Sequence, residues 1–219
     1  MELIYCGKGN KRLDNIAIDN GFKYGLRLPQ TKRVETDLYF ADQDWKSPNR
    51  KEYMKKVKEY MPRCATVLDL ERNEQFAEVM DWAEEIATWV TVIIIIPKCD
   101  VIDLIPYEIR GRKVRLGFSV PTTYGATDLS PTLFSDRDVH LLGGSPEKQL
   151  SYIEKMNVVS MDCNYHSMKA NRFGEYWTGK LKGETRWWVK YDGDLIDGKR
   201  SLSAFNVSCQ NIIKRFKDI

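Results

Sequence analysis

The sequence lacks any long apolar run, and its N-terminus lacks the pattern of a signal peptide. The longest apolar stretch, residues 89–97 (WVTVIIIIP), is far too short to span a bilayer. The first twelve residues, MELIYCGKGNKR, contain no apolar core of the kind that directs secretion. We therefore expect no membrane segment and favour a cytoplasmic location.

Paired cysteines are also missing. The five cysteines are scattered, odd in number and never spaced as CxxC, and the chain has two histidines in all. This pattern indicates neither a disulfide framework nor a thiolate zinc site. We expect no structural zinc, no other metal and no cofactor, in a reducing compartment.

The chain has little net charge and no sign of a linker. A formal charge of +3 is too small to indicate a nucleic-acid partner by itself, so local clusters must carry that argument. The length of 219 residues suits one domain, and there is no internal repeat or low-complexity tract. We expect a single domain over 1–219, with residues 175–219 forming a C-terminal hairpin and helix that pack on it.

Strand and helix patterns alternate along most of the chain. Expected strands cover 3–5, 22–28, 37–41, 65–68, 90–96, 114–120, 139–142 and 158–161, with an added strand at 186–191. Expected helices cover 49–61, 74–88, a segment beginning near 146, and 201–217. Such alternation is typical of parallel strands joined by crossover helices. The sequence therefore predicts a small, irregular TIM-like α/β barrel, and a doubly wound open sheet is the alternative.

The stretch 138–164 is the plainest βαβ unit. An apolar strand leads to Gly143 and Gly144, which allow a tight turn and close approach of backbone to a ligand. Ser145 stands where it can cap the next helix and Pro146 suits its first turn. A second apolar strand ends at Asp162. Because the two strands are expected to be parallel neighbours, the glycine pair and Asp162 should share the carboxyl edge of the sheet.

Three apolar strands are each followed by a carboxylate, namely Asp42, Asp69 and Asp162, and Asp44 competes with Asp42. In a barrel these acids would converge at one rim, where mutual repulsion should raise some of their pKa values. One acid can then act as nucleophile or electrostatic stabiliser while another transfers a proton, as in sugar hydrolysis by paired carboxylates. Aspartate also starts turns and caps helices at strand ends, which is the alternative reading of each residue.

The segments LLGGSPEKQL and VVSMDCNYHSMKANRFG together resemble the closing part of the tRNA-guanine transglycosylase barrel. In that family a G-x-G-T-P turn and helix precede an Asp-Cys strand end and a basic loop. The resemblance implies that Asp162 is the nucleophile that attacks the sugar C1′ and that Asp69 recognises the base. It also implies an early catalytic acid. Here DQDW replaces the family's Asp-Ser-Gly-Gly pattern, so the choice between Asp42 and Asp44 stays open.

Two departures from that family bear on the substrate. The tRNA enzymes carry a zinc site of three cysteines and a histidine, whereas Cys209 is the one cysteine after Cys163. The chain is also short. Both features favour the DNA-acting branch, which includes DNA 7-deazaguanine transglycosylases and antiphage glycosylases that excise glucosylated hydroxymethylcytosine from T-even phage DNA. The family's glycine-rich base loop would fall at 118–128, where glycines are few, so a different base is expected.

Residues around the expected nucleophile are candidates for binding. Tyr124 can stack on a base, or it can simply pack a loop. Asn164, Tyr165 and His166 follow Asp162 and can line its pocket, although a lone histidine is more often structural. Basic and aromatic residues beyond them suit a base-flipping enzyme, or else a solvated face over an aromatic cluster. These candidates for nucleic-acid binding are Lys169, Arg172, Lys182, Arg186, Trp187 and Lys190.

The resulting hypothesis is a DNA glycosylase of antiphage defence that acts on modified bases. Its best substrate is glucosylated hydroxymethylcytosine, and the product is an abasic site. The alternatives are a transglycosylase that inserts a 7-deazaguanine, a catalytically inactive barrel that binds nucleic acid, and a different barrel enzyme such as a sugar-phosphate lyase.

Overall fold

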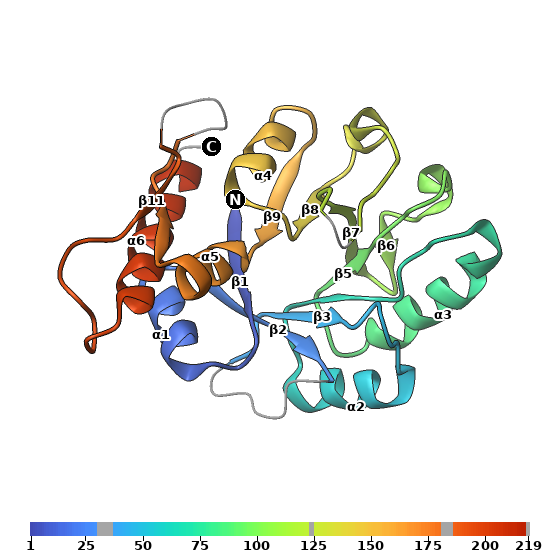
Figure 1. The fold of residues 1–219 in the computed structure, drawn as a ribbon. Coiled ribbons are helices and arrows are strands. Elements are labelled where there is room, and N and C mark those ends of the chain that lie inside the picture. Colours follow the sequence, from blue (N-terminus) through green and yellow to red (C-terminus); the bar gives the residue numbers. More distant parts are fainter. Residues whose placement is uncertain (30–36, 123–124, 181–185, 218–219) are drawn as a thin grey trace.

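Among the residues that the structure describes, eight parallel strands close into a barrel, as the ribbon in Figure 1 shows from one side. The structure is a computed structural model and describes residues 1–29, 37–122, 125–180 and 186–217. Neighbouring strands pair in the order β5-β4-β3-β2-β1-β9-β8-β7, and a parallel pairing between β5 and β7 closes the ring. The barrel strands are β1 (Glu2–Gly7), β2 (Lys23–Leu28), β3 (Phe40–Gln43), β4 (Cys64–Thr66), β5 (Val92–Ile95), β7 (Arg112–Ser119), β8 (Val139–Leu142) and β9 (Val158–Asp162). The predicted TIM-like barrel is confirmed, and the open-sheet alternative is wrong.

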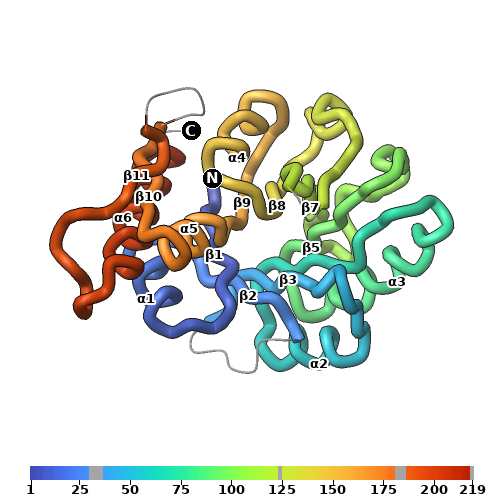
Figure 2. Tube along the Cα trace, viewed as in Figure 1, coloured from blue at the N-terminus to red at the C-terminus, as the bar shows by residue number. Residues whose placement is uncertain are grey.

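The crossovers are irregular. In the described part of the connections between barrel strands lie the helices α1 (Lys11–Asp19), α2 (Arg50–Tyr60), α3 (Phe76–Ile86) and α4 (Pro146–Ile153). The 3₁₀ turn η1 (Asn73–Gln75) leads into α3, while η2 (Ile102–Leu104) and η3 (Pro131–Phe134) lie between β5 and β7 and between β7 and β8. A two-residue strand, β6 (Glu108–Ile109), pairs antiparallel with the start of β7. Figure 2 shows these connections as a ring of unequal loops around the strands.

The C-terminal part adds a layer beside the barrel. After β9 come α5 (Tyr165–Phe173), a hairpin of β10 (Glu175–Trp177) and β11 (Trp188–Lys190), and α6 (Arg200–Lys217). Figure 1 shows α6 and the hairpin on one flank, next to α1 and α5. The described residues after β9 therefore include a two-stranded hairpin and a terminal helix. No helix in the described ranges is both long and apolar enough to cross a bilayer.

The barrel interior is filled in its middle by apolar side chains. Ile4, Phe40 and Ile94 belong to a buried cluster that is separate from the larger core outside the strands. Gly25 and Gly117 let this cluster close, because a Cβ atom at Gly117 would lie 2.5 Å from Ile96 Cγ1. Burial on both faces explains why β5 is a continuous apolar run, as the sequence predicts.

Several local expectations differ from the structure. Helices α1 and α5 are not predicted from the sequence, because each is short and α5 buries only His166 and Ala170. Ser145 stands at the N-cap position of α4 but accepts no capping hydrogen bond with its side chain. The strands β3 and β4 are shifted by one to three residues, so that Asp42 lies within β3 rather than after it.

Candidate active site in the barrel mouth

Asp162 is the last residue of β9 and lies at the mouth of the barrel, 8% exposed. The backbone N–H of Gly143 donates to its Oδ1 at 3.2 Å. Gln149 Nε2 from α4 donates to the carbonyl oxygens of Gly143 and Asp162, at 2.8 and 2.7 Å. Gly143 and Gly144 have φ values of +62° and +81°, a backbone conformation suited to glycine. The glycine turn thus holds the carboxylate directly, which explains the order and spacing of this motif.

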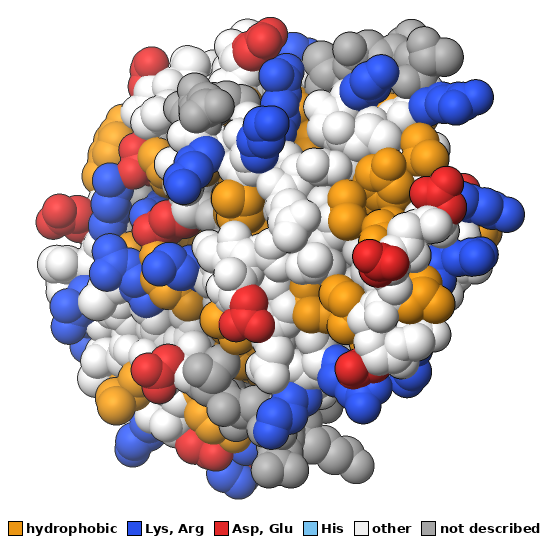
Figure 3. Space-filling model, turned by 90° about the vertical axis from the view of Figure 1, so that its left-hand side faces the viewer, with side chains coloured by type: hydrophobic (Ala, Val, Ile, Leu, Met, Phe, Trp, Pro, Cys, Tyr) orange, Lys and Arg blue, Asp and Glu red, His pale blue; other side chains and the backbone are white. Residues whose placement is uncertain are grey.

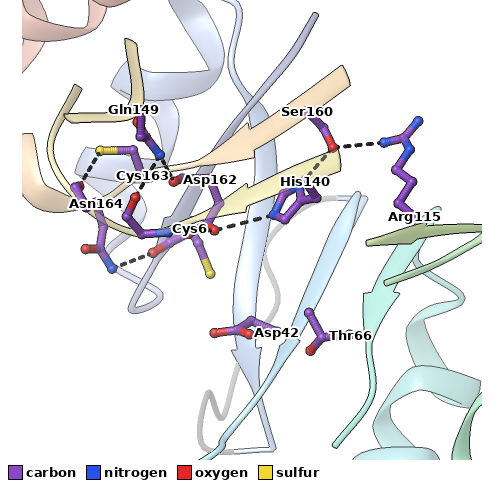
Figure 4. A network of polar contacts seen from close by, with 12 residues as sticks. Cys6, Asp42, Thr66, Arg115, His140, Gln149, Ser160, Asp162, Cys163 and Asn164 are labelled. Carbon is purple, nitrogen blue, oxygen red and sulfur yellow. Dashed lines mark hydrogen bonds and ion pairs between the residues drawn. The ribbon is translucent and has the colours of Figure 1, made fainter. Parts of the chain in front are cut away.

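A histidine supports the same carboxylate from inside the barrel. His140 Nε2 lies 3.4 Å from Asp162 Oδ1, and His140 Nδ1 lies 2.8 Å from Ser160 Oγ. Arg115 donates to Ser160 Oγ at 3.0 Å. Figure 4 shows these side chains following one another across β9, β8 and β7. Because His140 alternates with apolar residues in a short strand, the sequence alone gives no sign of this contact.

Asp42 lies within β3 on the inner surface of the barrel, with 19% of its side chain exposed. Burial first and the negative charge of Asp162 second raise its pKa from 3.8 to about 8, against the opposing effect of Arg27. The Arg27 Nε atom lies 3.7 Å from Asp42 Oδ2. Near neutral pH Asp42 is therefore a carboxylic acid that can donate a proton.

Asp44 has a different environment. Its Oδ1 accepts a hydrogen bond from the backbone N–H of Lys46 at 3.3 Å and lies 3.9 Å from Arg27 Nη1. This geometry is that of an aspartate that stabilises the turn after β3. Asp42 fits the early acid because burial and the charge of Asp162 raise its pKa.

Asp69 follows β4 and pairs with Lys98, whose Nζ lies 3.8 Å from Asp69 Oδ2. Lys98 also donates to Ser119 Oγ at 2.9 Å and to the carbonyl oxygen of Ala126 at 3.0 Å. Burial raises the pKa of Asp69 to about 6, although Lys98 lowers it. The Asp69 charge in turn raises the pKa of Asp42, so the expected acids share one rim.

The residues after Asp162 separate into two environments. The Asn164 side chain is exposed and donates to the carbonyl oxygen of Cys6 at 3.1 Å, which ties the ends of β9 and β1 together. Tyr165 is partly exposed and packs edge-on against Trp188, with ring centroids 5.7 Å apart. Both lie at the start of α5, close to the mouth.

His166 does not line the pocket, and that expectation is wrong. Its side chain is fully buried and stacks on Phe205 of α6 at a centroid distance of 5.0 Å, with Phe22 at 5.8 Å and Tyr5 at 5.7 Å. Burial lowers its pKa to about 3. His166 is therefore a neutral core residue, which is the alternative that the sequence left open.

The basic residues proposed to bind nucleic acid lie on α5 and the hairpin. Lys169 pairs with Glu175 and lies over the rings of Phe173 and Trp188, so its charge is already engaged. Arg172, Arg186 and Lys190 are exposed and Trp187 is partly exposed. Lys182 and Tyr124 lie outside the described residues. Figure 3 shows basic side chains on this flank mixed with acidic and apolar ones.

Functional groups that sequence reasoning missed come mainly from strand interiors. They are Arg27, Lys98, Arg115, His140 and Ser160. Trp45, 42% exposed directly after Asp44, also stands where β3 leaves the barrel. Among the described residues, no group of three histidine, cysteine or acidic side chains is placed to hold a metal ion.

Comparison with known proteins gives a family and no activity. A family model described as "Family of unknown function (DUF6610)" matches residues 17–205. No curated protein matches the sequence.

Proposed function

This chain belongs to the DUF6610 family, and we propose that it is a DNA glycosylase that removes a modified base through Asp162 and Asp42. The observation that carries the proposal is that two carboxyl groups with different environments, those of Asp42 and Asp162, lie in the same barrel mouth. Asp42 is held as an acid by burial and by the Asp162 charge, whereas Asp162 accepts a backbone hydrogen bond from Gly143. Cleavage of an N-glycosidic bond needs both kinds of group.

The chemistry balances with these two residues and water. Asp42 donates its proton to the base as the bond from C1′ to nitrogen breaks, and the base leaves with the bonding electrons. Asp162 stabilises the positive charge that develops at C1′, or bonds to it covalently. Water then adds its hydroxyl to C1′, displacing the Asp162 carboxylate with its bonding electrons where the covalent bond has formed, and the remaining proton of the water returns to Asp42. The product is a free base and an abasic site.

Aromatic side chains around the barrel mouth favour a substrate nucleotide that is flipped out of the DNA base stack. The target atom of a duplex base pair is reached only when the nucleotide is extruded into a pocket. The exposed ring of Trp45 and the partly exposed rings of Tyr165 and Trp188 offer faces for base stacking. We propose glucosylated hydroxymethylcytosine of phage DNA as the substrate and antiphage defence as the context, on the sequence resemblance.

The test is mass spectrometry of bases released from three DNAs: glucosylated T-even phage DNA, DNA containing 7-deazaguanine, and unmodified DNA. We expect release from the glucosylated DNA with matching abasic sites. Asp162→Asn and Asp42→Asn should each lower the rate by about a hundredfold or more. Asp81→Asn, the same change on the exposed face of α3, is the matched control and should leave the rate unchanged.

Three results would contradict the proposal. The first is the absence of a released base from all three DNAs. The second is an Asp162→Asn rate equal to that of Asp81→Asn. The third is incorporation of a labelled 7-deazaguanine base without abasic sites, which would mean base exchange in place of hydrolysis.

A further inference from the structure

A line of polar groups, partly exposed at its start and buried further along, runs through the barrel from its amino-terminal end to Asp162. Tyr39 donates to Glu2 at 2.5 Å, and Arg115 Nη1 lies 2.5 Å from the other Glu2 oxygen. Arg115 also donates to Ser160, which contacts His140. The Arg115 side chain is 8% exposed, and Ser160 and His140 are fully buried. Buried polar groups are retained where their hydrogen bonds are satisfied, so the proton positions along this line can be derived.

The direction of each hydrogen bond is set by Arg115. A guanidinium group has donors and no acceptor, so Ser160 Oγ must accept from Arg115. The single hydroxyl hydrogen of Ser160 then has His140 Nδ1 as its acceptor, at 2.8 Å. The opposite arrangement, with a proton on Nδ1, would leave that buried hydroxyl hydrogen without an acceptor among the described residues, at a cost in free energy.

The same assignment of donors and acceptors determines whether the other ring nitrogen of His140, Nε2, carries a proton. If Nδ1 is the acceptor, the neutral imidazole carries its proton on Nε2. Nε2 is fully buried and makes no hydrogen bond among the described residues, and Asp162 Oδ1 lies 3.4 Å away, within the range of an electrostatic contact. The ring of Phe40, 5.0 Å from the His140 ring, packs against it inside the barrel.

We propose that Arg115 and Ser160 hold His140 as its neutral Nε2–H tautomer and that His140 is the positioning residue of the Asp162 carboxylate. His140 Nε2, at 3.4 Å, and the N–H of Gly143, at 3.2 Å, both lie next to Oδ1 of Asp162. The kinetic part of this inference rests on the proposed function, whereas the tautomer does not.

Nitrogen NMR of the full chain, labelled with ¹⁵N-histidine, tests the tautomer directly. With two histidines in the sequence, the spectrum has two sets of ring signals, and His140→Gln identifies the set that belongs to His140. We expect a proton on Nε2 and an unprotonated Nδ1 for His140 at neutral pH. Asp162→Asn should shift the Nε2 signal, whereas Asp81→Asn should not. A proton on Nδ1, in either the neutral or the charged ring, would overturn the inference.

Ser160→Ala removes the hydroxyl that selects the tautomer, and Ser208→Ala is its matched control. Ser208 is an equally buried serine of α6 that accepts a hydrogen bond from the Trp177 backbone. We expect Ser160→Ala to populate the Nδ1–H form of His140 and to lower kcat about tenfold with KM unchanged. Ser208→Ala should alter neither. An unchanged tautomer in Ser160→Ala would contradict the inference.

The two proposals fail separately in this design. If His140 carries its proton on Nε2 and no DNA releases a base, the glycosylase proposal fails while the tautomer assignment is supported. If base release depends on Asp162 but His140 is protonated on Nδ1, the glycosylase proposal stands and the positioning role is overturned.

Discussion

Asp42 derives its proposed role from its neighbours. A carboxyl group in water ionises near pH 4, and such a group cannot protonate a leaving base at neutral pH. Burial inside β3 and the charge of Asp162 raise its pKa to about 8, while the guanidinium of Arg27, 3.7 Å away, limits the effect. Because the pKa of Asp42 is higher in the folded than in the unfolded chain, the free energy of unfolding must depend on pH.

The pH dependence of stability follows from that shift. Below pH 3.8 Asp42 is protonated in both the folded and the unfolded chain, so the raised pKa costs nothing. As the pH rises towards about 8 only the unfolded chain loses the proton, so the free energy of unfolding falls. Asp42→Asn removes this loss and should stabilise the protein more at pH 9 than at pH 5, by on the order of a few kcal/mol.

Urea unfolding of both proteins at the two pH values measures the difference. Asp81→Asn, whose carboxylate is exposed, should show an equal effect at both pH values. A stabilisation by Asp42→Asn that does not change between pH 5 and pH 9 would show that Asp42 titrates as an ordinary carboxyl group.

At the scale of elements, the barrel closes because two strands carry glycine on their inner face. A Cβ atom at Gly117 of β7 would lie 2.5 Å from Ile96 Cγ1 and 2.8 Å from Leu142 Cδ1, and φ is not the reason for the glycine. The atoms nearest to this Cβ position belong to side chains of β5, β8 and the residue after β5, and these side chains must shift to admit a methyl group. Overpacking of this kind typically costs about 1–3 kcal/mol.

Gly117→Ala should therefore lower the free energy of unfolding by about 1–3 kcal/mol, measured by urea unfolding. Gly193→Ala is the matched control, because its added methyl group would meet the end of the Tyr191 side chain on the surface. We expect the control to change stability by less than about 0.5 kcal/mol. Equal effects of the two substitutions would contradict the account of the barrel interior.

The elements also show what the sequence can and cannot predict. The run of residues 92–95 predicts its strand well, since burial on both faces leaves a continuous apolar pattern. The Gly143–Asp162 contact follows from the βαβ unit. The His140 contact does not, because it depends on which strands become neighbours and on the side to which each residue points. Helix α5 is not predicted, because its buried face packs on α6, which is distant in the sequence. His166 of α5 stacks on Phe205 of α6.

At the scale of the whole molecule, an aromatic cluster joins the barrel to the C-terminal layer. Phe205 of α6 is fully buried between His166 of α5 and Tyr5 of β1, with centroid distances of 5.0 and 5.2 Å. Phe22, just before β2, stacks on the same histidine. The cluster unites residues from both ends of the sequence, and the described part of the C-terminal layer therefore contributes to the larger core outside the barrel strands.

Phe205→Ala should destabilise the fold by about 3–5 kcal/mol, because it leaves a cavity that the surrounding rings cannot fill. Phe173→Ala, which removes the same side chain from a position that is 52% exposed, should cost much less. The measurement is urea unfolding followed by far-UV circular dichroism and by tryptophan fluorescence. If barrel and C-terminal layer unfold as one unit, both signals shift together in Phe205→Ala. Two separate unfolding transitions, of which only one shifts in Phe205→Ala, would mean that the C-terminal layer docks on a barrel that is stable without it.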